Sequence, residues 1–364
     1  MGSAKRIEAL RSRLAADAVE ALLVGASANM RYLTCFDGVF DDLGGGGAVV
    51  VTHDHARFYT DSRYIEAALT AAVGTEWDVR LQREALYTEV VADLHADGFE
   101  TLAMESAAPY ARFKLVSELF GGRVVMIDHA VERLRAVKDA GELAAIERAA
   151  ALTDAAFDHV VGTLRPGLRE VDLALALEGY MRGNGSEGVA FAAIAASGPN
   201  SSKPHAGASM RVISEGDFLT MDFGARLQGY CADLTRTVVI GRASDEQRRI
   251  YEAVLAANEA GRAAVRPGAH GADVDGVART LLTECGYGDA FGHGLGHGVG
   301  LEVHEMPGLR KTSNDVLEPG NVVTVEPGVY LPGFGGVRIE DLVAVEPGGH
   351  KLLSNARRDL IEIV

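Results

Sequence analysis

The sequence is short of positive charge and of long apolar runs. It holds 35 lysine and arginine residues against 51 aspartate and glutamate residues, a formal net charge of −16. No basic run is longer than a pair such as Arg248-Arg249, so the cationic surface that nucleic-acid binding requires is missing, and we expect no nucleic-acid partner. The longest apolar stretches, such as residues 46–52, are far too short to cross a bilayer. We therefore expect no membrane partner either.

Cysteine is also scarce. The three cysteines, Cys35, Cys231 and Cys285, are scattered and odd in number, which fits a reducing compartment better than a disulfide framework. The N-terminal segment lacks the uninterrupted apolar core and the small-residue cleavage site of a secretory signal. We expect a cytoplasmic protein.

Apolar residues are abundant, at 48% of the 364 residues, and a chain of this length suggests two domains. Helical periodicity over residues 5–17 precedes a short apolar run at 19–24, which predicts a helix and a strand. The runs 47–52 and 57–60 flank a polar turn and predict a hairpin. Because helix and strand patterns keep alternating, the predicted fold class is α/β (α+β).

The pattern changes near residue 131. Asp139 and Glu142 have the spacing of a capping box, and apolar positions recur every three to four residues from 141 to 161, so a long helix is predicted there. We take residues 1–130 and 131–364 as the two domains. Arg165-Pro166-Gly167 and Arg266-Pro267-Gly268 each precede a further helical stretch, which predicts an internal duplication in the second domain.

Two aspartates lie in a predicted β-hairpin. Residues 219–237 are apolar and β-branched on both sides of Gln228-Gly229, which is typical of two strands joined by a tight turn. Asp222 and Asp233 are symmetric about Leu227-Gln228 within this turn region, so we expect them to face each other about 5 Å apart. Carboxylates that close raise each other's pKa unless a cation neutralises them. Each aspartate taken singly is more simply a surface or turn residue in so acidic a chain.

A second acidic pair repeats this arrangement. Glu326 and Glu340 lie on strand-like segments, symmetric about Gly333 in a glycine-rich turn. Four carboxylates on two strand pairs would destabilise a core, whereas two divalent cations would neutralise them. The sequence therefore predicts a site for two metal ions.

Residues 292–305 hold His293, His297 and His304, interleaved with glycines that let the backbone approach a site closely. A phosphate-binding loop is the competing interpretation, but the Lys-Ser/Thr pair and the strand-to-helix context are missing. One imidazole with four carboxylates suits Mn²⁺ or Co²⁺, and Zn²⁺ is an alternative. Cys231 shares the strand parity of Asp233 and could lie near the metals, although a small buried side chain is the simpler role.

These motifs follow one another in a specific order. They are Asp222-Phe223-Gly224, Asp233-Leu234-Thr235-Arg236-Thr237, His293-Gly294-Leu295-Gly296-His297, Val303-His304-Glu305, Glu326-Pro327-Gly328-Val329-Tyr330 and Val337-Arg338-Ile339-Glu340-Asp341. The set resembles the Xaa-Pro peptidases, aminopeptidase P and prolidase, of the M24 metallopeptidases. The resemblance is close over residues 131–346 and weaker before them. It implies an N-terminal creatinase-like α/β domain and a C-terminal pita-bread catalytic domain.

The resemblance also implies residue roles. Asp222, Asp233, His297, Glu326 and Glu340 would bind the metals, with Asp233 and Glu340 bridging them. Glu326 would also move protons, while His205, His293, His304 and Arg338 would serve the substrate side. Taken alone, each of these three histidines could be an ordinary partly buried residue, and Arg338 a strand arginine paired with an acid.

The implied activity is that of a dinuclear metal-dependent peptidase, a hydrolase that cuts between an N-terminal residue and proline, as an aminopeptidase or a dipeptidase. Two divalent ions, expected to be Mn²⁺, would lower the pKa of a water between them so that a bridging hydroxide attacks the scissile carbonyl. The partners would be a peptide with proline at its second position and a second copy of the chain in a homodimer. The alternatives are a methionine aminopeptidase of the same fold and a non-catalytic or creatinase-like protein.

The N-terminal domain departs from the family pattern at residues 35–47, where an acidic stretch is followed by four glycines. We expect this loop to reach over the site of a partner subunit in the dimer. The choice between dipeptides and longer peptides stays open for that reason.

Overall fold

The computed structural model describes residues 2–36, 39 and 47–364. The chain divides into two compact units, Met1–Arg135 and Ala136–Val364. Most of the segment 35–47, which is expected to reach over a partner subunit, lies outside the described residues. Among the helices that are described, none is both long and apolar enough to span a bilayer.

The first unit is built on one six-stranded mixed sheet with strand order β4-β3-β2-β1-β5-β6. The predicted helix, strand and hairpin are confirmed as α1, β1 and the antiparallel pair β2 and β3. The elements are α1 (Ser3–Ala16), β1 (Ala21–Val24), α2 (Ser27–Thr34), β2 (Ala48–Thr52), β3 (Ala56–Thr60), α3 (Ile65–Ala71), β4 (Trp77–Leu81), α4 (Leu86–Ala96), β5 (Thr101–Glu105), α5 (Tyr110–Phe120), β6 (Arg123–Ile127) and α6 (Glu132–Ala136).

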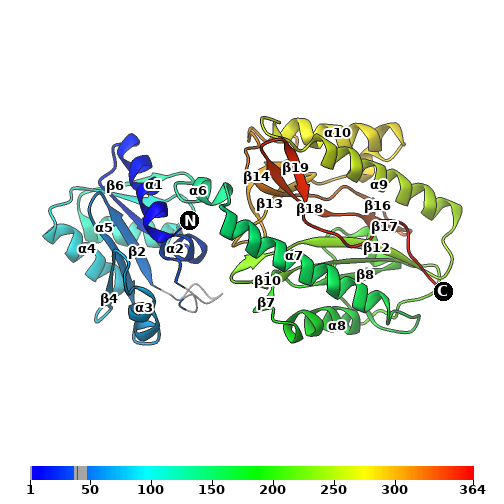
Figure 1. Cartoon of the computed structure of the whole chain (residues 1–364), viewed down its shortest axis with the longest axis horizontal. Helices are drawn as coiled ribbons and strands as arrows, with labels where there is room; N and C mark the ends of the chain where they lie inside the picture. Colours follow the sequence, from blue (N-terminus) through cyan, green and yellow to red (C-terminus); the bar gives the residue numbers. More distant parts are fainter. Residues whose placement is uncertain (1, 37–38, 40–46) are drawn as a thin grey trace. The chain divides into compact units, whose positions relative to one another are not determined.

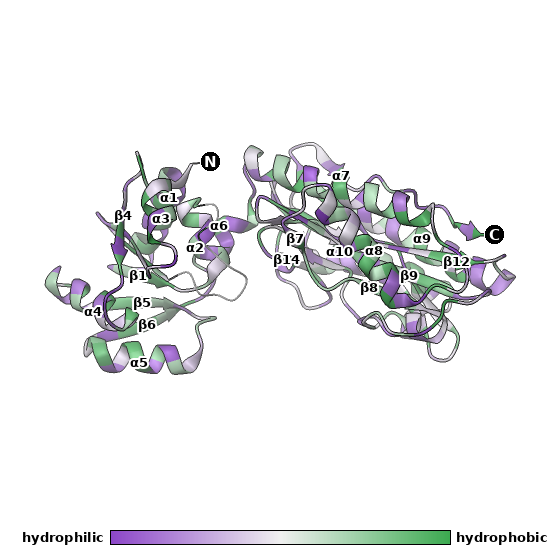
Figure 2. Cartoon of the chain, turned by 90° about the horizontal axis from the view of Figure 1, so that it is seen from below, coloured by the Kyte–Doolittle hydropathy of each residue, from purple (hydrophilic) through white to green (hydrophobic). Residues whose placement is uncertain are grey.

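The strands of this unit supply most of its apolar surface. Every residue of β1 and β2 is buried, and Figure 2 shows β5 and β6 mostly in the hydrophobic colour while α5 alternates between the two colours. Val90 and Leu94 of α4 pack into the same cluster as Leu102 and Met104 of β5. Each such fully buried aliphatic side chain stabilises the fold by about 1.5–3 kcal/mol.

In the second unit, two helix pairs enclose the strands. Figure 1 shows α7 and α8 on one side and α9 and α10 on the other, with the strands between them. The elements are α7 (Ala140–Val161), α8 (Glu170–Gly183), β7 (Gly188–Val189), β8 (Ile194–Ser197), the 3₁₀ helix η1 (Gly198–Ser202), β9 (Phe218–Phe223), β10 (Ala225–Leu227), β11 (Tyr230–Cys231), β12 (Leu234–Ile240), α9 (Asp245–Ala264), α10 (Gly271–Glu284), η2 (Gly288–Ala290), β13 (Gly296–Gly298), β14 (Glu305–Leu309), β15 (Val322–Val325), β16 (Gly328–Leu331), β17 (Gly335–Arg338), β18 (Asp341–Glu346), β19 (Gly349–Leu352) and β20 (Glu362–Ile363).

The long helix α7 begins where the capping box predicts. The Asp139 side chain accepts hydrogen bonds from the backbone N–H groups of Gly141 and Glu142, and the Glu142 side chain accepts one from the N–H of Asp139. These bonds satisfy donors that would otherwise be orphaned at the first turn of the helix.

The predicted duplication is visible in the topology of this unit. The pair α7 and α8 precedes the antiparallel ladders β8-β9-β12, and the pair α9 and α10 precedes the ladders β13-β15-β18. The two Arg-Pro-Gly segments lie directly before α8 and α10, as expected. Each half therefore contributes one set of three neighbouring strands. Asp222 lies on β9 and Asp233 directly precedes β12, whereas Glu326 directly follows β15 and Glu340 directly precedes β18.

Candidate metal centre

Asp222 lies on β9 and Asp233 directly precedes β12, the strand that pairs with β9, but the two aspartates do not occupy opposed positions. Strands β9 and β12 pair with Thr235 opposite Asp222, so the prediction that Asp233 faces Asp222 is wrong. The turn is centred on Gln228-Gly229, whose φ angles of 52° and 78° are both positive. This centre lies one residue after Leu227-Gln228, so the register differs by two residues from the expected one. Because strand side chains alternate between faces, a shift of two residues leaves both aspartates on the same face.

The prediction for the second acidic pair is confirmed. Strand β15 pairs with β18 so that Val325 lies opposite Asp341, and β16 pairs with β17 so that Gly328 lies opposite Arg338. Glu326 and Glu340 occupy matching positions in the interval between these two ladders, in the register that their symmetry about the turn predicts.

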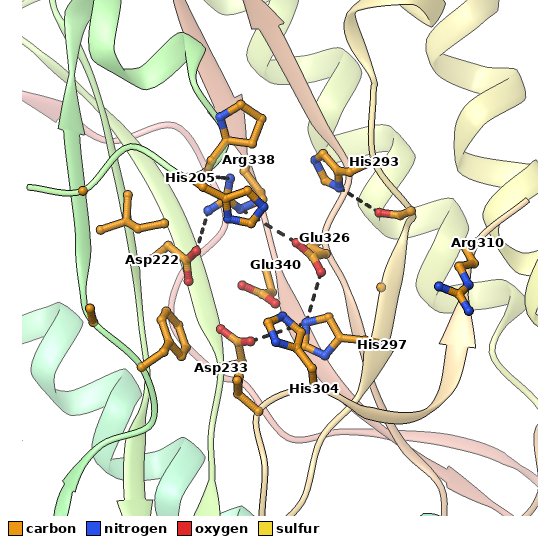
Figure 3. A pocket seen from close by; sticks show the side chains of 18 residues that line it. His205, Asp222, Asp233, His293, His297, His304, Arg310, Glu326, Arg338 and Glu340 are labelled. Atoms are coloured by element: carbon orange, nitrogen blue, oxygen red, sulfur yellow. Dashed lines mark hydrogen bonds and ion pairs between the residues drawn. The ribbon is translucent and has the colours of Figure 1, made fainter. Parts of the chain in front are cut away.

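Side chains from both halves meet in one place (Figure 3). Asp233, His297 and Glu340 each offer a ligand atom within 4.8 Å of the others. The Nε2 atom of His297 lies 3.3 Å from Glu326 Oε1 and 3.7 Å from Asp233 Oδ2. Four carboxylates and one imidazole, counting Asp222, therefore line a single pocket.

Arg338 holds Asp222 at one edge of this cluster. Its guanidinium donates to Asp222 Oδ2 at 2.5 Å, to Thr235 Oγ1 at 3.0 Å and to the Tyr330 hydroxyl at 2.8 Å. The other oxygen of Asp222, Oδ1, is buried and has no hydrogen-bond partner among the described residues. A buried carboxylate oxygen without a donor is costly unless a cation meets it.

The electrostatics of the cluster reflect its crowding. Burial raises the pKa of Asp233 and Glu340 well above the usual carboxyl range, and nearby carboxylates add to the effect. Burial alone would raise the pKa of Glu326 too, but the hydrogen bond and charge of His297 lower it to about 2. Burial would likewise lower the pKa of His297, but Glu326 raises it to about 9.

This donor set fits divalent metal ions. Carboxylate oxygens with one imidazole are ligands of hard-to-borderline cations, and two such ions would balance four carboxylates. The orphaned oxygen of Asp222 supplies an acceptor that the protein itself does not satisfy. Ligation by His297 requires the neutral imidazole, so metal binding and loss of its proton are coupled.

The three substrate-side histidines of the sequence prediction line the same pocket. His293 Nε2 lies 2.9 Å from the Tyr330 hydroxyl, and the rings of His304 and His297 lie edge to face with centroids 4.3 Å apart. Burial lowers the pKa of both His293 and His304, which favours neutral imidazoles at these two positions. His205 enters from the loop that follows η1.

The pocket has a volume of about 550 Å³. Phe191, Ile194, Pro204 and Val303 supply its apolar wall, which suits an apolar group beside the polar cluster. Cys231 is not among the described residues that line the pocket. It is buried, and its Sγ atom contacts the Leu301 carbonyl oxygen at 3.8 Å.

Sequence reasoning missed several residues of this site. Tyr330 links His293 to Arg338, Thr324 donates to Glu326 at 3.3 Å and accepts from the N–H of His297, and Arg310 lines the pocket. Tyr330 stands within one of the motifs quoted above, but neither its residue type nor its spacing indicates which partners it contacts.

A buried glutamate organises the loop that carries His205. Glu170, at the start of α8, is fully buried. Its carboxylate accepts from Ser197 N at 2.6 Å, Ser197 Oγ at 2.7 Å, Asn200 Nδ2 at 3.1 Å and Ser209 N at 3.1 Å. Both ends of the loop are thereby tied to one side chain.

Replacing this carboxylate tests its role. Burial alone would raise the pKa of Glu170, but the hydrogen bonds from Ser209, Ser197 and Asn200 outweigh it and lower the pKa. A carboxylate with a lowered folded-state pKa adds stability above its unfolded pKa, about 4.3, and this gain is lost as the pH falls through the folded pKa. We expect Glu170→Gln to lower the free energy of unfolding by about 1–3 kcal/mol near neutral pH, with a smaller difference below about pH 4.

Urea unfolding across this pH range measures the effect. Glu178→Gln is the matched control, because Glu178 lies on the same helix and pairs with Arg182 at the surface. Equal stability of the two variants near neutral pH would contradict the role given to Glu170.

Comparisons with known proteins bear on this site. The chain matches the sequence profile of metallopeptidase family M24 over residues 144–347 and that of the creatinase/prolidase N-terminal domain over residues 6–137. It is 34% identical over 358 residues to a Xaa-Pro dipeptidase of Pyrococcus furiosus, covering 98% of this chain and 99% of the relative.

Two solved structures are similar over almost the whole chain. One is a Xaa-Pro dipeptidase from Bacillus anthracis, with TM-score 0.94, 38% identity and coverage of 99% of this chain and 100% of that chain. The other is an X-Pro aminopeptidase from Thermotoga maritima, with TM-score 0.85, 36% identity and coverage of 95% and 98%. These similarities confirm the predicted fold, a creatinase-like α/β domain followed by a pita-bread domain.

Proposed function

Because this chain belongs to metallopeptidase family M24, we propose that it hydrolyses the bond between the N-terminal residue of a peptide and a proline at the second position. The observation that carries this proposal is the convergence of four carboxylates and one imidazole in a single pocket. The relatives quoted above are Xaa-Pro peptidases by name. Neither the methionine aminopeptidase nor the non-catalytic interpretation gains support from these comparisons.

We assign Asp222, Asp233, His297, Glu326 and Glu340 as the ligands of two divalent ions. Mn²⁺ is the proposed metal, with Co²⁺ and Zn²⁺ as alternatives, because carboxylate oxygens dominate the donor set and one imidazole completes it. The orphaned Oδ1 of Asp222 supports its place among the ligands, since it needs a partner that the chain does not offer.

The metals, when bound, would lower the pKa of a water molecule and stabilise negative charge on the scissile carbonyl oxygen. The remaining steps fall to protein side chains. Glu326 would accept the proton of the attacking water and deliver it to the departing proline nitrogen. His205 and His304 would donate N–H groups to the carbonyl oxygen as its charge develops, and a neutral His304 does so without repelling the cations.

The other pocket residues would position these groups. Arg338 donates to Asp222 Oδ2 and leaves Oδ1 without a hydrogen-bond partner among the described residues. The Tyr330 hydroxyl contacts the His293 ring and so would fix its position. Phe191 and Val303 belong to the apolar wall that would accept the proline ring and exclude water.

Further proposals concern the setting of the enzyme. We propose residues 1–130 as the N-terminal domain and 131–364 as the catalytic domain, in a cytoplasmic homodimer. Cys285 is exposed and forms no disulfide bond, in keeping with a reducing compartment. Light scattering of the purified protein measures the number of chains per particle.

The decisive experiment is product analysis by mass spectrometry. Metal-stripped protein is incubated with and without Mn²⁺ in a mixture of Ala-Pro, Ala-Pro-Ala and Met-Ala-Ser. Release of alanine that depends on Mn²⁺, with Met-Ala-Ser intact, is the expected result. Cleavage of Met-Ala-Ser alone would favour the methionine aminopeptidase, and binding of metal without any cleavage would favour a non-catalytic protein.

Arg310 bears on the choice between dipeptides and longer peptides. Its exposed side chain lines the pocket, and no described carboxylate forms an ion pair with it. Figure 3 shows Arg310 on the side of the cluster away from Asp222. In a Xaa-Pro dipeptide the free carboxylate belongs to the proline itself, close to the scissile bond. We propose that Arg310 pairs with this carboxylate.

Substitution of this arginine separates the two substrate classes. We expect Arg310→Ala to raise KM for Ala-Pro by about 10- to 100-fold, the loss of one charged hydrogen-bonded contact. Steady-state kinetics should show a much smaller change for Ala-Pro-Ala, whose carboxylate lies one residue further away, and Arg310→Lys should fall between. An equal loss for both peptides would remove Arg310 as a determinant of length.

A further inference from the structure

The two strands that carry Asp233 and Glu340 belong to different sheets. Asp233 directly precedes β12, in the sheet β20-β12-β9-β8, and Glu340 directly precedes β18, in the sheet β14-β13-β15-β18-β19. A ligand atom of each lies within 4.8 Å of the other and of His297. The separation of these two carboxylates therefore depends on the contacts between β12 and β18, the strands that follow them in the two sheets.

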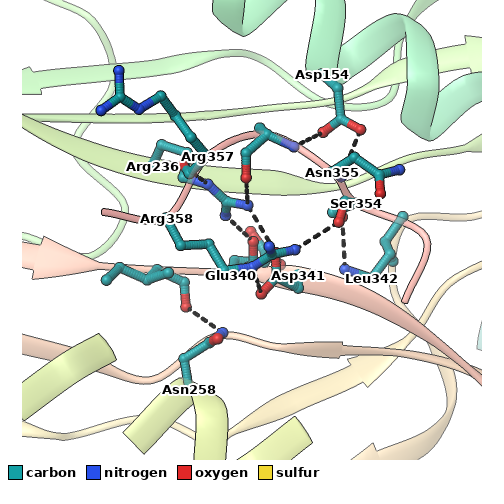
Figure 4. A network of polar contacts seen from close by, with 12 residues as sticks. Asp154, Arg236, Asn258, Glu340, Asp341, Leu342, Ser354, Asn355, Arg357 and Arg358 are labelled. Atoms are coloured by element: carbon teal, nitrogen blue, oxygen red, sulfur yellow. Dashed lines mark hydrogen bonds and ion pairs between the residues drawn. The ribbon is translucent and has the colours of Figure 1, made fainter. Parts of the chain in front are cut away.

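A buried ion pair lies at that place (Figure 4). Arg236 of β12 donates to Asp341 Oδ1 at 2.8 Å, and both side chains are at most 1% exposed. Arg236 also donates to the backbone carbonyl oxygen of Glu340. Arg236, on the strand that follows Asp233, thus hydrogen-bonds to both Glu340 and Asp341.

The guanidinium of Arg236 has no donor to spare. Besides its contacts with Asp341 and Glu340, it donates to the carbonyl oxygens of Thr235 at 2.9 Å, Ala356 at 2.8 Å and Arg357 at 3.0 Å. All five N–H groups of an arginine are used, and two of them bind the segment 354–358. That segment is consequently part of the same network.

The segment 354–358 also binds the second carboxylate oxygen of Asp341, Oδ2. Arg358 donates to Asp341 Oδ2 at 2.7 Å and to the Ser354 carbonyl oxygen at 2.6 Å. Ser354 Oγ accepts from the N–H of Leu342 at 2.9 Å. Asp154 of α7 fixes the segment by accepting from two of its backbone N–H groups.

We propose that Arg358, through Asp341, is a positioning residue for Glu340 and thereby sets the affinity of the metal centre. The inference rests on the metal ligands assigned under the proposed function. Arg358 hydrogen-bonds to Asp341 and Ser354 and is not among the described residues that line the pocket. It acts together with Arg236 and Arg262, whose guanidinium groups also contact the Asp341 carboxylate, and so orients the preceding residue toward Asp233. Groups that orient metal ligands in this way typically change metal affinity by about 10- to 100-fold when they are removed.

The variant Arg358→Met tests this proposal, because methionine keeps the length of the side chain and removes its charge and donors. Arg357→Met is the matched control, since the Arg357 side chain pairs with Asp359 at the surface and makes no contact with Asp341 among the described hydrogen bonds and ion pairs. Titration calorimetry with Mn²⁺ on the metal-stripped full chain should show a Kd raised about 10- to 100-fold in Arg358→Met. The control should match the wild type, and Arg358→Lys should recover part of the affinity.

A role in stability alone predicts a different result. It would lower the melting temperature of Arg358→Met in the metal-free form while leaving the Kd for Mn²⁺ within twofold of the wild type, and that outcome would overturn the proposal. Arg262→Met is a second variant if the first does not fold, because Arg262 contacts the same Asp341 oxygen at 3.3 Å, and the same shift in Kd is expected. Failure of the wild type to bind Mn²⁺ would instead count against the metal site itself.

Discussion

Asp233→Asn is expected to abolish peptide hydrolysis and to lower the metal bound by one equivalent per chain. Asp233 Oδ2 lies 3.7 Å from His297 Nε2 and offers a ligand atom within 4.8 Å of one on Glu340, and it is the carboxylate that we propose as a shared ligand of the two metals. An amide oxygen is a neutral and weaker ligand than a carboxylate. The loss of kcat/KM should exceed the roughly 100-fold that removal of an outer partner causes, because a direct ligand is lost.

Metal analysis and stability measurements together isolate this effect. The metal-free variant should be at least as stable as the metal-free wild type, because one of several crowded buried carboxylates has been neutralised. Asp289→Asn, at an exposed aspartate outside the cluster, is the control and should behave as the wild type. Full turnover with two bound metals in Asp233→Asn would exclude the bridging role.

Removal of the metals is expected to lower the melting temperature of the second unit by roughly 10 °C. A ligand present at about a thousandfold excess over its Kd stabilises the folded state by about 4 kcal/mol, and about 1 kcal/mol shifts the melting temperature of a unit this size by roughly 2–4 °C. The buried carboxylates then also repel one another without their counterions. Scanning calorimetry before and after chelation measures the shift.

The first unit supplies an internal reference for this measurement. Its residues, Met1–Arg135, contribute none of the proposed ligands, so its transition should stay where it was. Adding Mn²⁺ back should restore the second transition. If chelation moved both transitions equally, or neither, the cluster would not be the metal site that the donor set indicates.

The sequence predicted one acidic pair well and the other only in part. Glu326 and Glu340 flank a turn whose symmetry matches the register of two successive ladders. For Asp222 and Asp233 the turn was predicted correctly, but the pairing was centred on Leu227-Gln228 instead of Gln228-Gly229, so the register differed by two residues. The prediction that both aspartates lie on the same face of the sheet is still correct, because strand side chains alternate with a period of two. A register error of one residue would have separated the pair.

The supporting contacts could not be predicted from the sequence. Arg236 and Asp341 are separated by more than a hundred residues, and Glu170 meets Ser197 and Ser209 across 27 and 39 residues. Local spacing carries no information about which charged residues will meet across two sheets. Periodicity predicted α7 and its cap because those contacts lie within a few residues of each other.

Strand β20 comes last in the chain but belongs to the sheet β20-β12-β9-β8, whose other strands come much earlier. This order has a consequence for synthesis on the ribosome. Strand β20, Glu362–Ile363, pairs with β12 and completes the sheet that carries the aspartates, and the segment 354–358 closes the network behind Glu340. Domains generally fold in order as the nascent chain emerges, so the first unit is free to fold early. The second unit must wait for these late residues, and a stalled chain lacking them should capture Mn²⁺ poorly although every proposed ligand has already been translated.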